Sequence, residues 1–222
     1  MSRCQSISSG GATAQDFSIS GSISLDHFTC PGVFKCAGSA KLHSSQLNKV
    51  RVSGSTKLVD TVANQIHSSG SFHASGCRLG SVDASGSAQL FSCTLLDGMN
   101  ASGSLNLTAS KIHGKVLSSG GAEIVNSTID QTLESSGRLI KVIDSTIKEI
   151  FVKPCSSYSW SLKLGFFNWE YQSSTSDPQK VELSGKSCKV DTIHFKTAAP
   201  GVVILKNGAP APHVINGQIC IG

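Results

Sequence analysis

The sequence has few charged and few aromatic residues, and it has no long apolar run. Charged residues make up 15% and aromatic residues 6% of the 222 residues. Lysines and acids are scattered, whereas nucleic-acid-binding proteins gather positive charge on one face or helix, so the net charge of +5 does not predict nucleic-acid binding. No stretch approaches the roughly 20 apolar residues that a membrane-spanning helix requires.

A secretion signal is also missing from the sequence. The first residues, Met1 to Gln5, lead into a Ser- and Gly-rich stretch and not into the apolar core of roughly 7–15 residues that a signal peptide needs. We therefore expect a cytoplasmic protein, with association at a membrane surface left open.

Motifs that carry chemistry are absent. There is no CxxC pair, no Cys/His quartet with zinc spacing, no GxSxG, no P-loop and no HExxH. The seven histidines scatter over the repeat described below, and the aspartates do not gather as in polysaccharide-cleaving β-helix enzymes. We expect no catalytic residue, no cofactor and no metal, and therefore a protein that is not an enzyme.

The eight cysteines are many for a cytoplasmic protein. Cys30 and Cys36 flank Pro31-Gly32 and could meet across a turn, but buried small thiols are the favoured interpretation. Cys77 and Cys93 fall at the same place in consecutive repeats, a spacing that a disulfide tolerates. In a reducing compartment we expect two thiols there.

A repeat of 16 to 17 residues, marked by glycine, organises most of the chain. The marking glycines are Gly21, Gly38, Gly54, Gly70, Gly86, Gly103, Gly120 and Gly137. Apolar residues recur in phase two, four, nine, and twelve or thirteen positions after each glycine, and small residues recur at position seven. Alternation with polar neighbours is the signature of strands with one buried face, whereas serine and glycine interrupt any helical period.

Each repeat thus predicts one coil with three short strands. The predicted fold is all-β, a right-handed parallel β-helix (three-sided β-solenoid) of seven or eight coils with 16–17 residues each. One coil cannot bury its own apolar face, so stability must come from stacking coil on coil. A left-handed three-sided coil, as in hexapeptide acyltransferases, is disfavoured because that class needs strict six-residue steps.

The repeat pattern divides the chain into four segments. Residues 1–20 form an N-terminal segment or cap, with Phe17 and Ile19 in a first partial coil, and residues 21–153 form the β-solenoid. Residues 154–180 are an aromatic insert or hairpin. Residues 181–222 resume the strand pattern with a period near 22 residues, which predicts wider coils that continue the stack and a closing strand at 218–221.

The aromatic insert holds the candidate interaction residues. Both tryptophans and both tyrosines of the chain fall here. Either they form a hairpin that plugs or flanks the solenoid, or they make a partner-binding surface, or they anchor the protein at a membrane interface. The candidates are Tyr158, Trp160, Phe166, Phe167, Trp169 and Tyr171.

With the coil established, the chain resembles the bactofilins, a class of polymer-forming bacterial cytoskeletal proteins. The resemblance covers about residues 18–153 and 181–222. It is carried by coil starts such as Gly86-Ser-Ala-Gln-Leu90 and Gly103-Ser-Leu-Asn-Leu107, and by Val-Ile-Asn-Gly-Gln-Ile at 214–219. Serine is more frequent and valine less frequent here than in that class, and the aromatic insert has no counterpart in the core of that class. The resemblance implies a small right-handed β-helix that polymerises end to end without nucleotide, often at membranes.

Three functions follow as hypotheses. The first is a non-enzymatic scaffold that self-associates into homo-oligomers or filaments through the solenoid ends. The second is a protein- or glycan-binding module, such as an adhesin or a host-directed bacterial protein, that uses the aromatic insert or one solenoid face. The third, a glycan-active enzyme, would require acidic residues stacked in a groove, which the sequence does not predict.

Overall fold

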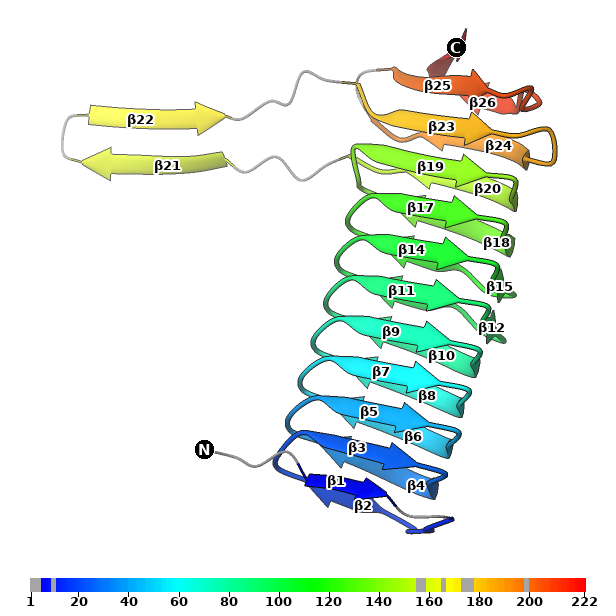
Figure 1. The fold of residues 1–222 in the computed structure, drawn as a ribbon. Helices are drawn as coiled ribbons and strands as arrows, with labels where there is room; N and C mark the ends of the chain where they lie inside the picture. The colour runs from blue at the N-terminus through cyan, green and yellow to red at the C-terminus, as the bar shows by residue number, and fades with distance from the viewer. Residues whose placement is uncertain (1–4, 9–10, 155–158, 165–166, 173–177, 198–199) are drawn as a thin grey trace.

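The computed structural model is an all-β solenoid of about 11 turns, in which the coils stack through parallel pairing (Figure 1). It describes the chain except residues 1–4, 9–10, 155–158, 165–166, 173–177 and 198–199, and it describes no side chain within 5–8 and 159–172. The predicted fold class is therefore confirmed. The stack exceeds seven or eight coils because the N-terminal partial coil and the C-terminal coils join it.

Two long sheets run the length of the solenoid. In stacking order, the first consists of β1 (Gln5–Ser8), β3 (Ile23–Asp26), β5 (Ala40–His43), β7 (Thr56–Val59), β9 (Phe72–Ser75), β11 (Ala88–Phe91), β14 (Leu105–Thr108), β17 (Ala122–Val125), β19 (Leu139–Ile143), β23 (Lys180–Ser184), β25 (Gly201–Lys206) and β27 (Gly217–Ile221). The second consists of β2 (Phe17–Ile19), β4 (Thr29–Cys36), β6 (Gln46–Val52), β8 (Val62–Ser68), β10 (Arg78–Ala84), β12 (Thr94–Leu95), β15 (Lys111–Ile112), β18 (Thr128–Ser135), β20 (Thr146–Val152), β24 (Lys189–Phe195) and β26 (His213–Ile215), with β13 (Met99–Ala101) and β16 (Val116–Ser118) beside them.

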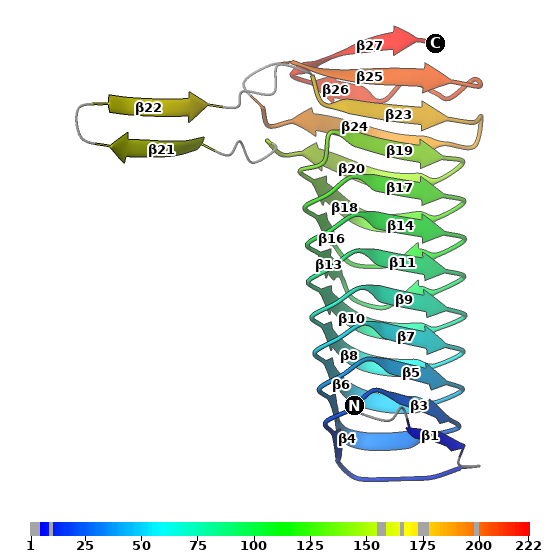
Figure 2. The same ribbon diagram turned by 60° about the vertical axis from the view of Figure 1, so that its left-hand side comes forward.

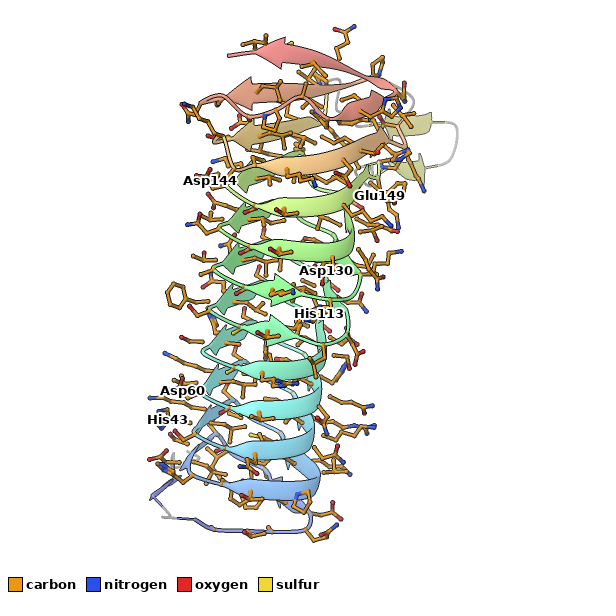
Figure 3. All side chains as sticks on the ribbon, turned by 90° about the vertical axis from the view of Figure 1, so that its right-hand side faces the viewer. His43, Asp60, His113, Asp130, Asp144 and Glu149 are labelled. Atoms are coloured by element: carbon orange, nitrogen blue, oxygen red, sulfur yellow. The ribbon has the colours of Figure 1, made fainter. Side chains whose placement is uncertain are left out.

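The second sheet bends and so supplies two of the three predicted sides. In β8 the burial pattern breaks at two successive exposed residues, Asn64 and Gln65, and the inward alternation restarts with Ile66. In two coils the bend interrupts the strand completely, which separates β12 from β13 and β15 from β16. The chain runs along the first sheet, returns along the second and climbs toward the C-terminus, which makes the coil right-handed (Figures 1 and 3).

The core consists of vertical columns of inward side chains. The coil that begins at Gly70 buries Phe72, Ala74, Cys77, Leu79, Val82 and Ala84. In register, Leu79 lies between Ala63 and Leu95, so each apolar residue is covered by the coils on both sides. Burying a Leu or Ile side chain contributes roughly 1.5–3 kcal/mol, so stacking is the main source of stability.

The glycines that mark the repeat lie at a corner where successive backbones touch. None of them has a positive φ. A Cβ on Gly70 would lie 2.8 Å from the carbonyl carbon of Gly54, and a Cβ on Gly86 would lie 2.9 Å from that of Gly70. The glycine period therefore reflects close packing between coils and not an unusual backbone angle.

A second corner, which the sequence pattern did not reveal, uses the left-handed region of φ. One residue per coil has positive φ where the first sheet gives way to the second. These residues are His27, Ser44, Asp60, Gly76, Ser92, Ala109, Asn126, Asp144, Gly185 and Asn207. Asn, Asp and Gly tolerate this angle best. Because other residue types also occupy the corner here, no single residue pattern in the sequence predicted it.

The C-terminal segment continues the stack. Strand β23 pairs with β19, and β24 pairs with β20. The stack therefore continues across the insertion of residues 153–179, which lies between β20 and β23 in the sequence. The aromatic insert forms β21 (Ser159–Leu164) and β22 (Phe167–Gln172), an antiparallel sheet separate from the two solenoid sheets (Figures 1 and 2).

Candidate functional site

The C-terminal end of the solenoid exposes residues that belong to core columns. Strand β27 pairs only with β25 among the described strands, in a register that sets Ile219 on Val203 and Ile221 on Leu205. Val203 and Leu205 are buried, whereas Ile219 is 42% exposed and Ile221 is 90% exposed. The apolar interior therefore continues to the last rung and is uncovered there, and β27 ends the first sheet in the described chain (Figure 2).

The second sheet ends differently. Its last strand, β26, sets the partly buried Val214 on the core residue Ile193, whereas Ile215, which is 42% exposed, lies on His194 in a column that faces outward. Beside it, the side-chain amide of Asn216 donates hydrogen bonds to the carbonyl oxygens of Phe195 and Thr197, at 3.0 and 2.7 Å, and so fixes the turn that leads into β27. The predicted closing strand exists, but it leaves an apolar strand edge at the end of the stack.

The N-terminal end is built differently. Strands β1 and β2 end the two sheets there, and each pairs with one described strand. Phe17 of β2 stacks on Phe34 at a ring-centroid distance of 5.3 Å and meets Phe28 edge-on at 5.3 Å. An aromatic cluster therefore supports this terminal coil from within.

The hairpin β21–β22 brings four of the predicted interaction residues into register. Trp160 pairs with Tyr171 and Leu162 pairs with Trp169, while Leu164 pairs with Phe167. Tyr158 and Phe166 lie outside the described residues. The described strands of the insert pair as a hairpin, and the binding role of these residues stays a prediction.

Rung-spanning histidine–aspartate pairs are a feature that the sequence analysis missed. Nδ1 of His43 lies 2.7 Å from Oδ1 of Asp26, Nδ1 of His67 lies 3.2 Å from Oδ2 of Asp83, and Nδ1 of His113 lies 2.6 Å from Oδ2 of Asp130. His43 and His113 lie on opposite sides of the solenoid (Figure 3). The sequence contained a signal for these pairs, because the aspartate and the histidine of each pair stand at the same position of neighbouring repeats.

The corner around His43 is the densest of these groups. His27 also lies near Asp26, at 3.0 Å, and Asp60 lies 3.7 Å from Nε2 of His43. The hydrogen bond from His43, together with the charges of both histidines, outweighs the effect of burial and lowers the pKa of Asp26. The carboxylates of Asp26 and Asp60 lie next to histidine side chains. The described residues contain no cluster of three or more ligands that could hold a metal ion.

A buried carboxylate lies between two lysines on the bent sheet. The side chain of Glu134 is 11% exposed and forms ion pairs with Lys115 and Lys153, one from each adjacent coil. Burial alone would raise the pKa of Glu134, but the two ammonium groups outweigh it and lower the pKa. The triad joins three coils by charge as well as by backbone pairing.

This triad predicts a pH-dependent stability. Because the pKa of Glu134 is lower in the folded protein than in the unfolded chain, its contribution is present above the unfolded pKa and is lost as pH falls through the folded pKa. Glu134→Gln should lower the free energy of unfolding at pH 7 by about 1.5–3 kcal/mol, and the difference should be smaller at acidic pH, where Glu134 becomes protonated. Glu149→Gln, at a carboxylate with no ion pair in the described part of the chain, is the control for urea unfolding at both pH values. An equal loss at both values would contradict the assignment.

The described cysteines are free thiols. Cys30, Cys36, Cys77, Cys93 and Cys188 are buried and Cys220 is exposed. Cys30 and Cys36 lie in one strand, β4, and do not meet across a turn. The thiols of Cys77 and Cys93 occupy the column of small residues and donate to the carbonyl oxygens of Ser75 and Phe91, at 3.2 and 3.3 Å.

Comparisons with known proteins add no relative. No protein-family model, no curated protein and no solved structure matches this chain. Within the residues that the structure describes, no helix is long and apolar enough to cross a membrane.

Proposed function

We propose that the protein is a non-enzymatic scaffold that self-associates through the ends of its solenoid, as the bactofilin resemblance implies. The observation that carries the proposal is the position of Ile219 and Ile221, which continue buried columns and yet are 42% and 90% exposed. An unpaired strand edge with apolar side chains beside it is a template for pairing with another chain.

The end can accept another copy by the contacts that already hold the coils together. A strand placed on β27 would satisfy its free backbone groups and cover Ile219 and Ile221, just as β27 covers Val203 and Leu205. Covering one isoleucine contributes roughly 1.5–3 kcal/mol, so two isoleucines and a strand edge provide a basis for specific association.

Light scattering across a dilution series and electron micrographs of the purified protein test the proposal. We expect assemblies or filaments that persist on dilution to low micromolar concentration. A monodisperse monomer at high protein concentration would overturn it.

The aromatic hairpin supports a second candidate, a protein-binding module. The cross-strand pairs of apolar residues alternate with polar pairs such as Ser161–Glu170 and Lys163–Asn168. Trp and Tyr are the residues that most often carry binding energy at protein interfaces. Since β21 and β22 pair only with each other among the described strands, the hairpin is not part of the stacked core.

Replacing Trp160 and Trp169 together with alanine separates the two candidates. If the hairpin binds a partner, the double variant should lose partner capture while its far-UV circular dichroism spectrum and its self-association stay unchanged. Loss of self-association in this variant would instead assign the hairpin to the assembly interface.

A further inference from the structure

We propose that the outer face of the first sheet around Phe91 binds an acidic oligosaccharide that runs along the solenoid axis. A shallow hollow of about 370 Å³ opens there over strands β7, β9, β11 and β14. Its polar and aromatic lining includes Lys57, His73, Gln89, Phe91, Asn106 and Thr108. The proposal goes beyond self-association, because this face lies along the side of the solenoid and not at its ends.

Phe91 supplies the apolar platform of the hollow. It is 55% exposed, whereas Phe28, Phe34, Phe72 and Phe195 are buried. Among the described residues its ring makes no aromatic or cation–π contact. An exposed aromatic face is a surface on which the C–H groups of a pyranose ring can pack.

The shape of the hollow follows from the column in which Phe91 stands. In register, Ser75 lies between Val59 and Phe91, and Thr108 follows Phe91. A small residue between two large ones leaves a depression of one coil height, about 4.8 Å. The hydroxyl groups of Ser75 and Thr108 border the ring on both sides and can form hydrogen bonds with a sugar.

The neighbouring column determines the charge of the ligand. In register it reads Lys41, Lys57, His73, Gln89 and Asn106, all exposed. Within the described residues neither Lys41 nor Lys57 forms an ion pair with a carboxylate. The ammonium groups of Lys57 and Lys41 lie two and three coils from Gln89 and Phe91, and they complement a sugar carboxylate or sulfate attached to a chain with many hydroxyl groups.

A single-stranded nucleic acid fits this face less well. Such a ligand carries one phosphate per nucleotide, and its binding sites combine a basic groove with several aromatic residues. Here one aromatic ring is present, and Glu123 follows Asn106 in the same column. The charge along the column therefore changes sign over a few coils, which an intermittently charged glycan tolerates better than a continuous phosphate chain.

Isothermal titration with tetrasaccharides of galacturonate, mannuronate and hyaluronan tests the site, with maltotetraose and oligo(dT) as comparison probes. We expect at least one acidic tetrasaccharide to bind and maltotetraose to bind at least about tenfold more weakly. Phe91→Ala should weaken binding by about tenfold, and Phe91→Trp should retain it. Lys57→Gln should weaken binding and reduce its dependence on salt.

Leu96→Ala is the matched control, because Leu96 is 44% exposed and lies outside the hollow. It should leave binding unchanged, and Phe91→Ala should leave self-association unchanged, so the failure of one proposal is distinguishable from the failure of the other. No binding of any acidic tetrasaccharide, equal binding by the Phe91→Ala variant, or preferential binding of oligo(dT) would each overturn the proposal.

Discussion

Ile219→Asp is expected to abolish self-association while leaving the solenoid folded. The side chain is already 42% exposed in the last strand, so the change costs little in the isolated protein. In an assembly the same position would be covered by another copy, and a buried, unpaired carboxylate is strongly unfavourable. Losing the isoleucine contact alone removes roughly 1.5–3 kcal/mol, which weakens association by about 10- to 100-fold before the charge is counted.

Leu96→Asp provides the control for this prediction. Leu96 is 44% exposed, similar to Ile219, but it lies beside the stack in the middle of the chain. Light scattering should show smaller particles for the Ile219 variant and unchanged assemblies for the Leu96 variant. If both variants assemble like the natural protein, the interface does not involve β27. If both dissociate, the effect comes from added negative charge and not from the solenoid end.

Gly70→Ala is expected to destabilise the solenoid by overpacking a corner where the backbones of successive coils touch. A Cβ at this position would lie 2.8 Å from the carbonyl carbon of Gly54 and 2.9 Å from the nitrogen of Ser55. Both atoms belong to the backbone of the preceding coil, so relief of the overlap requires the two coils to separate. Overpacking of this kind costs about 1–3 kcal/mol, and here it also strains the backbone hydrogen bonds on both sides.

Gly21→Ala tests the same chemistry at the end of the glycine stack. A Cβ on Gly21 meets nothing within 4 Å, and its φ lies outside the left-handed region. This variant should be neutral or slightly more stable, because alanine restricts the unfolded chain more than glycine does. Urea unfolding should therefore place the Gly70 variant well below the natural protein and the Gly21 variant at or above it. Equal midpoints for both would mean that the glycine column has no packing role.

Several parts of the architecture could be predicted because they repeat. Leu42, Leu58 and Leu90 recur at one position of the coil, and all are buried in the observed columns. The six inward positions per coil also match the alternation in the sequence. Phe17 and the segment from residue 181 lie in the same stack, and their alternation continues that of the neighbouring coils.

Other features could not be predicted from the repeat alone. The sequence suggested three separate strands per coil, but the second and third often fuse into one bent strand such as β8. The bend is a property of the coil's closure, which residues far apart in sequence determine together. The Glu134 triad escaped notice for a related reason, since Lys115 and Lys153 stand 19 positions on either side of Glu134, more than one repeat away.

The sequence by itself determined the period, the inward and outward faces and the parallel stacking, because a recurring apolar residue can be buried in only one way when each coil must cover the last. The tertiary structure alone decided which surfaces are left over. Exposure at Ile219, Ile221 and Phe91 depends on whether a neighbouring rung or side chain covers them, and these residue types also occur in the buried columns. The candidate functional surfaces of this protein are therefore those where apolar or aromatic side chains of the solenoid lack a covering neighbour.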